Sequence, residues 1–143
     1  MKTVREILEQ KGGEVYTASP EEMVFDAIRR LCELGVGSLV VVEQGRPVGL
    51  FSERDYTCKV VLEGRSSRET PVEAVMSRRM LVVTPDTTTA ACMALMTENR
   101  VRHLPVVEEG KLVGLVSIGD IVKDIIDEQQ FVIEQLEKYV YYS

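Results

Sequence analysis

The chain has 143 residues, of which 45% are apolar, and its net charge is −6. These values fit one compact soluble domain or two closely packed halves, and the negative charge argues against a nucleic-acid surface. No apolar run approaches the roughly 20 residues that cross a bilayer, and three scattered cysteines with a single histidine, His103, disfavour a zinc or redox site. The first ten residues lack the apolar segment of a signal peptide, so the cytoplasm is the expected compartment.

The first half of the chain begins with the pattern helix, strand, helix. Residues 2–10 are amphipathic, which predicts a short helix inside an N-terminal segment of residues 1–14. Val15–Ala18 follows as a short strand. Ser19-Pro-Glu-Glu22 joins an N-cap serine to a proline at the first helical position, so we expect a helix that begins there and stops at Gly35.

Two strands and a turn complete this half. Ser38–Val42 and Val48–Phe51 are apolar runs of strand length, and Glu43-Gln-Gly-Arg46 between them is a hairpin turn signal. A short helix is expected after the second strand. The polar segment 65–71 then has the composition of a linker.

The second half repeats the first at a fixed offset of 65 residues. Residues 36–55 align without a gap on residues 101–120, and 11 of the 20 positions are identical. Leu81–Val83, Thr84-Pro85 and Glu108-Glu-Gly-Lys111 repeat the strand, the helix start and the hairpin turn. Such self-similarity indicates a duplicated structural unit. We therefore predict an α+β fold of two pseudo-twofold-related β-α-β-β-α units, each with a three-stranded sheet and two helices, whose interface would hold two related pockets.

The repeat also sets the predicted boundaries. The first unit covers residues 15–64 and the second covers residues 72–128, with the linker 65–71 between them. Helical segments lie outside the units at both ends, over residues 1–14 and 129–143.

Each unit closes with the same signature, Gly-hydrophobic-hydrophobic-Ser-x-x-Asp, at Gly49–Asp55 and Gly114–Asp120. One interpretation is helix capping alone, with the serine as N-cap and the aspartate in the first helical turn. The other is that the carboxylate also accepts hydrogen bonds from a ribose diol, while free N–H groups at the helix start meet a phosphate. The two interpretations are compatible.

Basic residues near these signatures differ between the units. Arg54 stands in the first signature where the second has Gly119, and Arg102 and His103 begin a strand where the first unit has glycine and serine. Solvent-exposed surface charge is the usual role of arginine, but a planar guanidinium beside a helix start also suits phosphate. Two such pockets would not bind one ligand equally well.

Together these features resemble a tandem pair of CBS domains (a Bateman module) over about residues 15–128. The resemblance rests on the repeated element order, on the signature that closes each copy, and on Arg102-His-Leu-Pro-Val-Val107. It implies two sheets packed through a pseudo-twofold interface, often paired into flat dimers. It also implies adenosine-containing ligands in the clefts: AMP, ADP, ATP, NAD or S-adenosylmethionine.

The resemblance further implies roles for single residues in two pockets. Asp55 and Asp120 would hold ribose, Ser52 and Ser117 would contact ribose or phosphate, and Arg54, Arg102 and His103 would take phosphates. Thr17, Ala18, Val36, Gly37 and Ser38 would frame adenine beside Asp120, and Val82, Val83 and Val101 would do so beside Asp55. Gly119 departs from the pattern, which puts the phosphate affinity of the Asp120 pocket in doubt.

Three hypotheses for the function follow. The leading one is a non-enzymatic adenine-nucleotide sensor, without catalytic cofactor, that acts in trans on a regulated protein the sequence does not name. The second is an enzyme, which one histidine and the lack of a glycine-rich phosphate loop disfavour. The third is a structural homodimer with vestigial pockets. Nucleotide binding separates the first hypothesis from the third, and turnover of the nucleotide would identify the second.

The C-terminal segment adds a long apolar stripe. Ile121, Ile125, Val132, Leu136, Tyr139 and Val140 recur at helical spacing, and Phe131, Tyr141 and Tyr142 add aromatic surface. The stripe either folds back onto its own sheet or meets a second copy of the chain. We expect a homodimer in which this helix takes part, and no nucleic-acid or membrane partner.

Overall fold

The computed structural model describes residues 2–142, with side chains described through Val140. After helix α1 (Val4–Lys11) come strand β1 (Thr17–Ala18), helix α2 (Val24–Leu34), strands β2 (Ser38–Glu43) and β3 (Arg46–Ser52), and the turn α3 (Glu53–Asp55), which continues as the π-helical η1 (Tyr56–Val61). The 3-10 turn η2 (Val72–Ala74) then leads to helix α4 (Thr89–Asn99), strands β4 (His103–Glu108) and β5 (Lys111–Ser117), and helix α5 (Ile118–Tyr142). This order confirms the predicted α+β pair.

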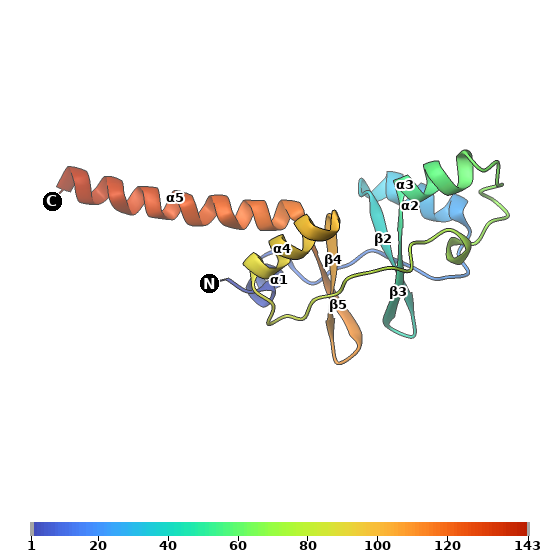
Figure 1. The fold of residues 1–143 in the computed structure, drawn as a ribbon, viewed down its shortest axis with the longest axis horizontal. Coiled ribbons are helices and arrows are strands. Elements are labelled where there is room, and N and C mark those ends of the chain that lie inside the picture. The colour runs from blue at the N-terminus through green and yellow to red at the C-terminus, as the bar shows by residue number, and fades with distance from the viewer. Residues whose placement is uncertain (1, 143) are drawn as a thin grey trace.

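Two small sheets stand side by side in the middle of the molecule (Figure 1). In the first sheet, β1 runs parallel to β2 and β2 runs antiparallel to β3. The hairpin turns of the two sheets meet, because the Leu112 N–H donates to the Gly45 carbonyl at 3.1 Å and Lys111 Nζ donates to the Gln44 carbonyl at 2.7 Å. In each turn both central residues have positive φ, at Gln44 and Gly45 and again in the equivalent pair, as a two-residue hairpin requires.

The second sheet has two strands where three were expected. The third is reduced to a single parallel bridge between Val83 and Val106. Pro105 supplies the physical reason. In the first sheet, the Val40 N–H donates to the Tyr16 carbonyl at 3.2 Å. Pro105 is the residue equivalent to Val40 and has no N–H to donate, so one hydrogen bond of the ladder is lost and the pairing stops at one residue.

The predicted start of the first long helix is wrong. Residues 19–22 form a turn, in which the Glu22 N–H donates to the Ser19 carbonyl at 3.2 Å, and α2 begins only at Val24. In the second unit, α4 begins at Thr89, with the Thr88 hydroxyl as its cap. The predicted end is confirmed, because Gly35 is left-handed at φ +68°.

The segment that leads into each unit along the chain packs against the other unit. The Val4 N–H of α1 donates to the Thr87 carbonyl of the second unit at 2.9 Å, and the Val72 N–H of η2 donates to the Glu22 carbonyl of the first unit at 2.8 Å. The acceptors Glu22 and Thr87 are equivalent at the 65-residue offset. The segments at residues 19–23 and 84–88 are therefore hydrogen-bonded to these crossing segments, which is why neither belongs to a helix.

The two hydrophobic cores follow the same crossing. The core of the first unit contains Val72, Val75 and Met76, although these residues come after the linker. The core of the second unit contains Val4 and Ile7 of α1. No single cut of the chain separates the two cores, and the predicted boundaries stay predictions.

Helix α5 extends away from the body of the molecule (Figure 1). Ile121 is fully buried, whereas the apolar side chains from Ile125 to Val140 are exposed. The helix therefore does not fold back onto its own sheet, which was one of the two alternatives from the sequence. The side chains of Tyr141 and Tyr142 lie outside the described part. No helix within residues 2–142 is both long and apolar enough to cross a membrane.

Candidate functional site

Both Ser-x-x-Asp turns form reciprocal caps at the start of a helix. In the first, the Asp55 N–H donates to Ser52 Oγ at 3.2 Å and the Ser52 N–H donates to Asp55 Oδ2 at 3.0 Å. In the second, the Asp120 N–H donates to Ser117 Oγ at 3.1 Å and the Ser117 N–H donates to Asp120 Oδ2 at 2.8 Å. The capping interpretation thus holds at both turns, and each cap fixes the direction of its carboxylate.

The first carboxylate, Asp55, is enclosed by donors of its own unit and of the segment that follows the linker. Asp55 is only 6% exposed. The Ser77 hydroxyl lies 3.2 Å from Asp55 Oδ1, and Lys59 Nζ lies 3.0 Å from the same oxygen. A ribose that bound here would have to replace or share these donors.

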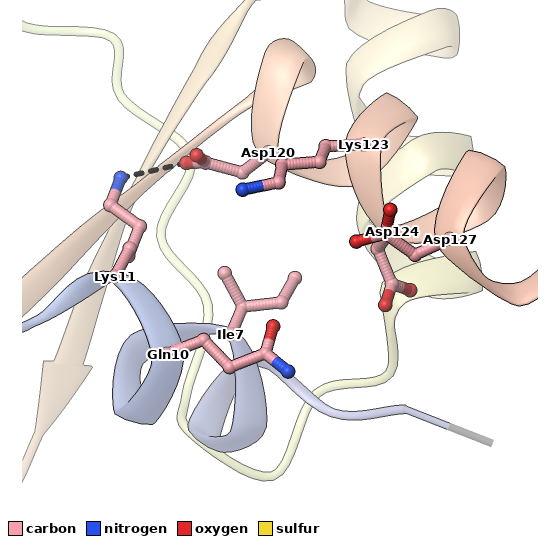
Figure 2. Close-up of a pocket in the computed structure, with 7 residues that line it drawn as sticks. All are labelled: Ile7, Gln10, Lys11, Asp120, Lys123, Asp124 and Asp127. Atoms are coloured by element: carbon pink, nitrogen blue, oxygen red, sulfur yellow. Dashed lines mark hydrogen bonds and ion pairs between the residues drawn. The ribbon is translucent and has the colours of Figure 1, made fainter.

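The second carboxylate is more open and is paired with a residue of α1. Lys11 Nζ donates to Asp120 Oδ2 at 2.7 Å (Figure 2). It also donates to the Leu115 carbonyl at 2.9 Å. Partial burial of Asp120 acts to raise its pKa, but the hydrogen bonds from Lys11 and from the Ser117 turn outweigh burial and lower the pKa overall. Asp120 is therefore ionised at neutral pH and carries a bound ammonium group.

A cleft of about 330 Å³ opens between the two units next to this ion pair. The first unit lines it with Val36, Gly37 and Ser38, and the second unit with His103 and Ser117. These five are residues that the sequence assigned to nucleotide binding. The structure thus brings most of the predicted Asp120 pocket together across the interface between units.

Five further residues, none of them predicted as site residues from the sequence, also line the cleft: Lys11, Glu14, Val15, Tyr16 and Leu115. Tyr16 lies beside the predicted residue Thr17, and Leu115 lies within the Gly114–Asp120 signature, so the sequence gave a usable signal for both. Lys11 gave none, because α1 precedes the repeat and only its crossing to the second unit brings Lys11 here. Lys11 also lines a smaller cavity of about 90 Å³ that contains Asp120 (Figure 2), so it stands where the two cavities meet.

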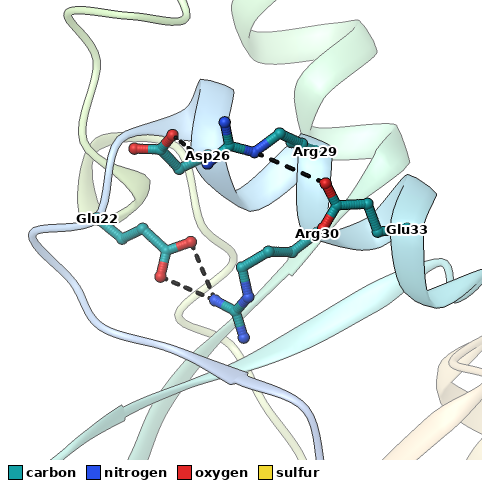
Figure 3. Close-up of polar contacts among 5 residues, drawn as sticks. All are labelled: Glu22, Asp26, Arg29, Arg30 and Glu33. Atoms are coloured by element: carbon teal, nitrogen blue, oxygen red, sulfur yellow. Dashed lines mark hydrogen bonds and ion pairs between the residues drawn. The ribbon is translucent and has the colours of Figure 1, made fainter.

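Thr17 and Ala18, expected to frame adenine in this pocket, are held in place by α2. Arg30 forms an ion pair with Glu22 at 2.9 Å (Figure 3). It also donates to the Thr17 carbonyl, which ties the short strand β1 to the helix. Thr17 is half-buried, whereas the Ala18 side chain lies in the first core. Ala18 could therefore meet a ligand only through its backbone.

The residues predicted to frame adenine beside Asp55 differ in accessibility. Val82 is 47% exposed, and Val101 is half-buried against the second core. Val83 is 4% exposed, and its side chain belongs to that core. Its side chain is therefore not available to a ligand.

The predicted phosphate-binding residues lie on accessible positions around both turns. Arg54 and Arg102 are exposed, and neither guanidinium forms an ion pair within residues 2–142. The Arg102 carbonyl accepts from the Ile118 N–H at 2.9 Å, which fixes the backbone at the mouth of the cleft. His103 is half-buried, and burial together with the nearby Lys11 charge lowers its pKa, so the imidazole is neutral at pH 7.

Helix α1 is also joined to α5 at its other end. Lys2 Nζ lies 2.8 Å from Asp124 Oδ1, and the Asp124 side chain is only 3% exposed. Neither Asp124 oxygen has a hydrogen-bond partner of good geometry among the described residues, although Asp124 is the main cause that raises the pKa of Lys2. The contact is a charge pair, because opposite charges 2.8 Å apart attract each other strongly in a buried position. Among the described residues, no group of three or more His, Cys, Asp or Glu side chains is arranged to hold a metal ion.

This arrangement of paired units is that of CBS domains, and comparison with known families agrees. The CBS domain model matches residues 4–58 and again residues 72–127. The chain belongs to the CBS domain family and contains two copies in tandem.

Several relatives share most of the chain. CBS domain-containing protein CBSX3, mitochondrial, from Arabidopsis thaliana is 35% identical over 96% of this chain and 71% of its own length. The structure of a protein with CBS domains from Burkholderia ambifaria is 47% identical, with a TM-score of 0.83 over 90% of this chain and 96% of its own. The structure of CBSX2 in complex with AMP is 25% identical, with a TM-score of 0.76 over 90% of this chain and 99% of its own.

Proposed function

We propose that this CBS pair is a non-enzymatic regulatory module that binds an adenine nucleotide between its units and acts on another protein in trans. The candidate ligands are AMP, ADP, ATP and NAD. The observation that carries the proposal is the cleft of about 330 Å³, which joins Val36–Ser38 of one unit to Ser117 of the other beside the Asp120 turn. Its size falls within the range of small-molecule pockets. The CBSX2 relative in complex with AMP supports the ligand class.

The chemistry of the cleft suits binding better than turnover. A carboxylate beside a helix start can accept from ribose hydroxyls, and the free N–H groups of the helix can face phosphate. A hydrolase would need a nucleophile with an adjacent base, whereas the Ser117 hydroxyl of this cleft accepts the Asp120 N–H as a helix cap.

The test is a thermal-shift panel with AMP, ADP, ATP, NAD and S-adenosylmethionine on protein first shown to be ligand-free. A ligand at 100 times its Kd stabilises the native state by about 2.7 kcal/mol, which is worth several degrees of melting temperature for a chain of this size. We expect a shift with one or more nucleotides, and we expect the nucleotide to stay chemically unchanged over hours. No shift with any of them at millimolar concentration would favour a structural module with vestigial pockets.

We also propose that the chain forms a homodimer in which α5 takes part. Seven positions on α5 alternate in spacing between four and three residues, and all seven are exposed: Ile118, Val122, Ile125, Gln129, Val132, Leu136 and Tyr139. This is the spacing of a seam between two helices. Ile126, Ile133 and Val140 widen the seam on one side, and so broad an apolar face on an isolated helix is unfavourable in water.

Light scattering on the full chain at tens of micromolar tests the dimer. Leu136→Glu should weaken it, because a charge would be buried in the seam, whereas Gln130→Glu makes the same charge change outside the seam and should have no effect. A truncation after Gln130 should also weaken the dimer. A full-length monomer would refute the proposal, and a truncated dimer of equal strength would place the interface elsewhere.

A further inference from the structure

Lys11 occupies the carboxylate that the proposed function assigns to ribose. Its ammonium group lies 2.7 Å from Asp120 Oδ2 and 2.9 Å from the Leu115 carbonyl, and it lines the cleft as well as the smaller cavity behind it. A ribose hydroxyl that approaches Asp120 therefore meets a group that already holds this oxygen. Figure 2 shows the Lys11 side chain reaching from the end of α1 to Asp120.

The second signature has no basic residue of its own. Where the first unit has Arg54, the second has Gly119. A Cβ on Gly119 would lie 3.5 Å from the Ser117 hydroxyl, which is an ordinary contact. The lack of a cation in this turn is thus not forced by crowding at Cβ, and Lys11 is the basic group whose amine hydrogen-bonds to the carboxylate of the turn.

We infer that Lys11 is the residue that makes the Asp120 cleft prefer a phosphorylated adenosine over adenosine itself. This inference rests on the proposed nucleotide binding and assigns its specificity. When ribose takes Asp120, Lys11 loses its carboxylate partner. A nucleotide provides a new anionic partner in its phosphate, and the flexible four-carbon stem lets the ammonium move to it. Adenosine provides no such partner, so an adenosine complex leaves Lys11 without the charge-assisted hydrogen bond that it had.

This exchange has two consequences of opposite sign. Lys11 competes with any ribose for Asp120 and so weakens adenosine. It also forms a charge-assisted hydrogen bond with a phosphate and so strengthens the binding of AMP. Removal of the ammonium should therefore weaken AMP but leave adenosine unchanged or tighter, a pattern that simple damage to the pocket would not give.

The single histidine makes the measurement specific for this cleft. His103 lines it and is the only histidine in the chain, so the NMR signals of its ring report occupation of this pocket and not of the Asp55 turn. Titrations with AMP and with adenosine would be followed on the full chain for the wild type, Lys11→Met and Lys11→Arg. Lys123→Met is the matched control, because it removes the same charge beside Asp120 but lines only the smaller cavity.

In the wild type and in Lys123→Met, we expect AMP to bind about tenfold or more tightly than adenosine, as one hydrogen bond between charged groups allows. In Lys11→Met the ratio should fall to about one to three, and Lys11→Arg should keep most of it. If Lys11→Met does not fold, Lys11→Gln replaces it. A wild-type protein that prefers AMP and keeps that ratio in Lys11→Met would overturn the inference alone. A wild-type protein whose His103 signals respond to no nucleotide would overturn the proposed function, and the inference with it.

Discussion

The close approach of the crossing segments to the sheets can be tested at two equivalent glycines. Gly49 of β3 and Gly114 of β5 occupy the same position in the repeat. A Cβ on Gly114 would lie 2.7 and 2.8 Å from the two methyl carbons of Leu8 in α1. A Cβ on Gly49 would lie 2.7 Å from the Met76 sulfur and 3.0 Å from the Ser77 carbonyl oxygen. Alanine at either site must therefore displace the segment that crosses from the other unit.

The two substitutions should differ in cost. Overpacking of this kind destabilises by about 1–3 kcal/mol. The methyl groups of Leu8 can turn aside, so Gly114→Ala should fall near the lower end. The Ser77 carbonyl cannot move freely, because Ser77 and Leu50 exchange two backbone hydrogen bonds at 3.0 and 2.8 Å. We therefore expect Gly49→Ala to cost more, near the upper end of that range.

Urea denaturation of the single and double variants measures these costs. Leu8→Ala removes the methyl groups that the new Cβ would strike, so Leu8→Ala/Gly114→Ala should cost at least about 0.5 kcal/mol less than the sum of its two single changes. The control is the double variant Gly49→Ala/Leu8→Ala. Its two changes lie in different cores, so their costs should be additive. Additive costs for the Leu8 and Gly114 pair, or a greater cost at Gly114 than at Gly49, would refute the proposed contact.

Three further predictions concern the charged groups. Asp55→Asn and Asp120→Asn should each lower nucleotide affinity, measured by calorimetry, by more than the roughly 1 kcal/mol of a changed cap; unchanged affinity in both would leave capping as their whole role. Burial lowers the pKa of His103 from its ordinary 6.5, so the unfolded chain binds this proton first and the stability should decline as the pH falls below 6.5; His103→Gln should flatten that part of the urea stability curve, and an unaltered slope would contradict the assignment. Lys2→Met should lower the free energy of unfolding by about 3–5 kcal/mol, since it leaves the Asp124 carboxylate buried and unpaired, whereas Lys2→Met/Asp124→Leu should recover most of the loss. Equal losses in the single and the double variant would show that an unpaired Asp124 is not the cause.

The fold could be predicted because its signals are local and occur twice. The hairpins depend on a two-residue turn with glycine, and the end of α2 depends on Gly35, each of which is written in consecutive residues. The tandem arrangement follows from the repeat itself. The helix start at Ser19 was predicted from equally good local signals and is nevertheless wrong, because the backbone there bonds to a segment some fifty residues later. A capping pattern cannot reveal a partner so distant in the chain.

The same reason explains which of the predicted residues line the cleft. Val36, Gly37, Ser38, His103 and Ser117 lie within or beside the repeated strands, so the register of the repeat placed them at one interface. The sequence did not predict which side chains at such positions are accessible. Val82 is exposed, whereas the next residue, Val83, is buried. The predicted residues that line the cleft nevertheless come from both units.

Lys11 was missed because its position depends on the crossing of α1, which leaves no mark in the repeat. The crossing has a further physical consequence. Lys11 at the end of α1 and Lys2 just before α1 hold α5 at Asp120 and Asp124, one helical turn apart. Asp120 is also the carboxylate beside the cleft. Two charge pairs on successive turns fix a short helix more firmly than either alone, because each keeps the other's ion in reach. The state of the cleft and the attachment of the long exposed helix therefore depend on the same few charges, whereas the Asp55 turn draws its cation, Lys59, from its own helical segment. The two halves share a backbone design, but only the second connects its turn to a surface that extends beyond the pair.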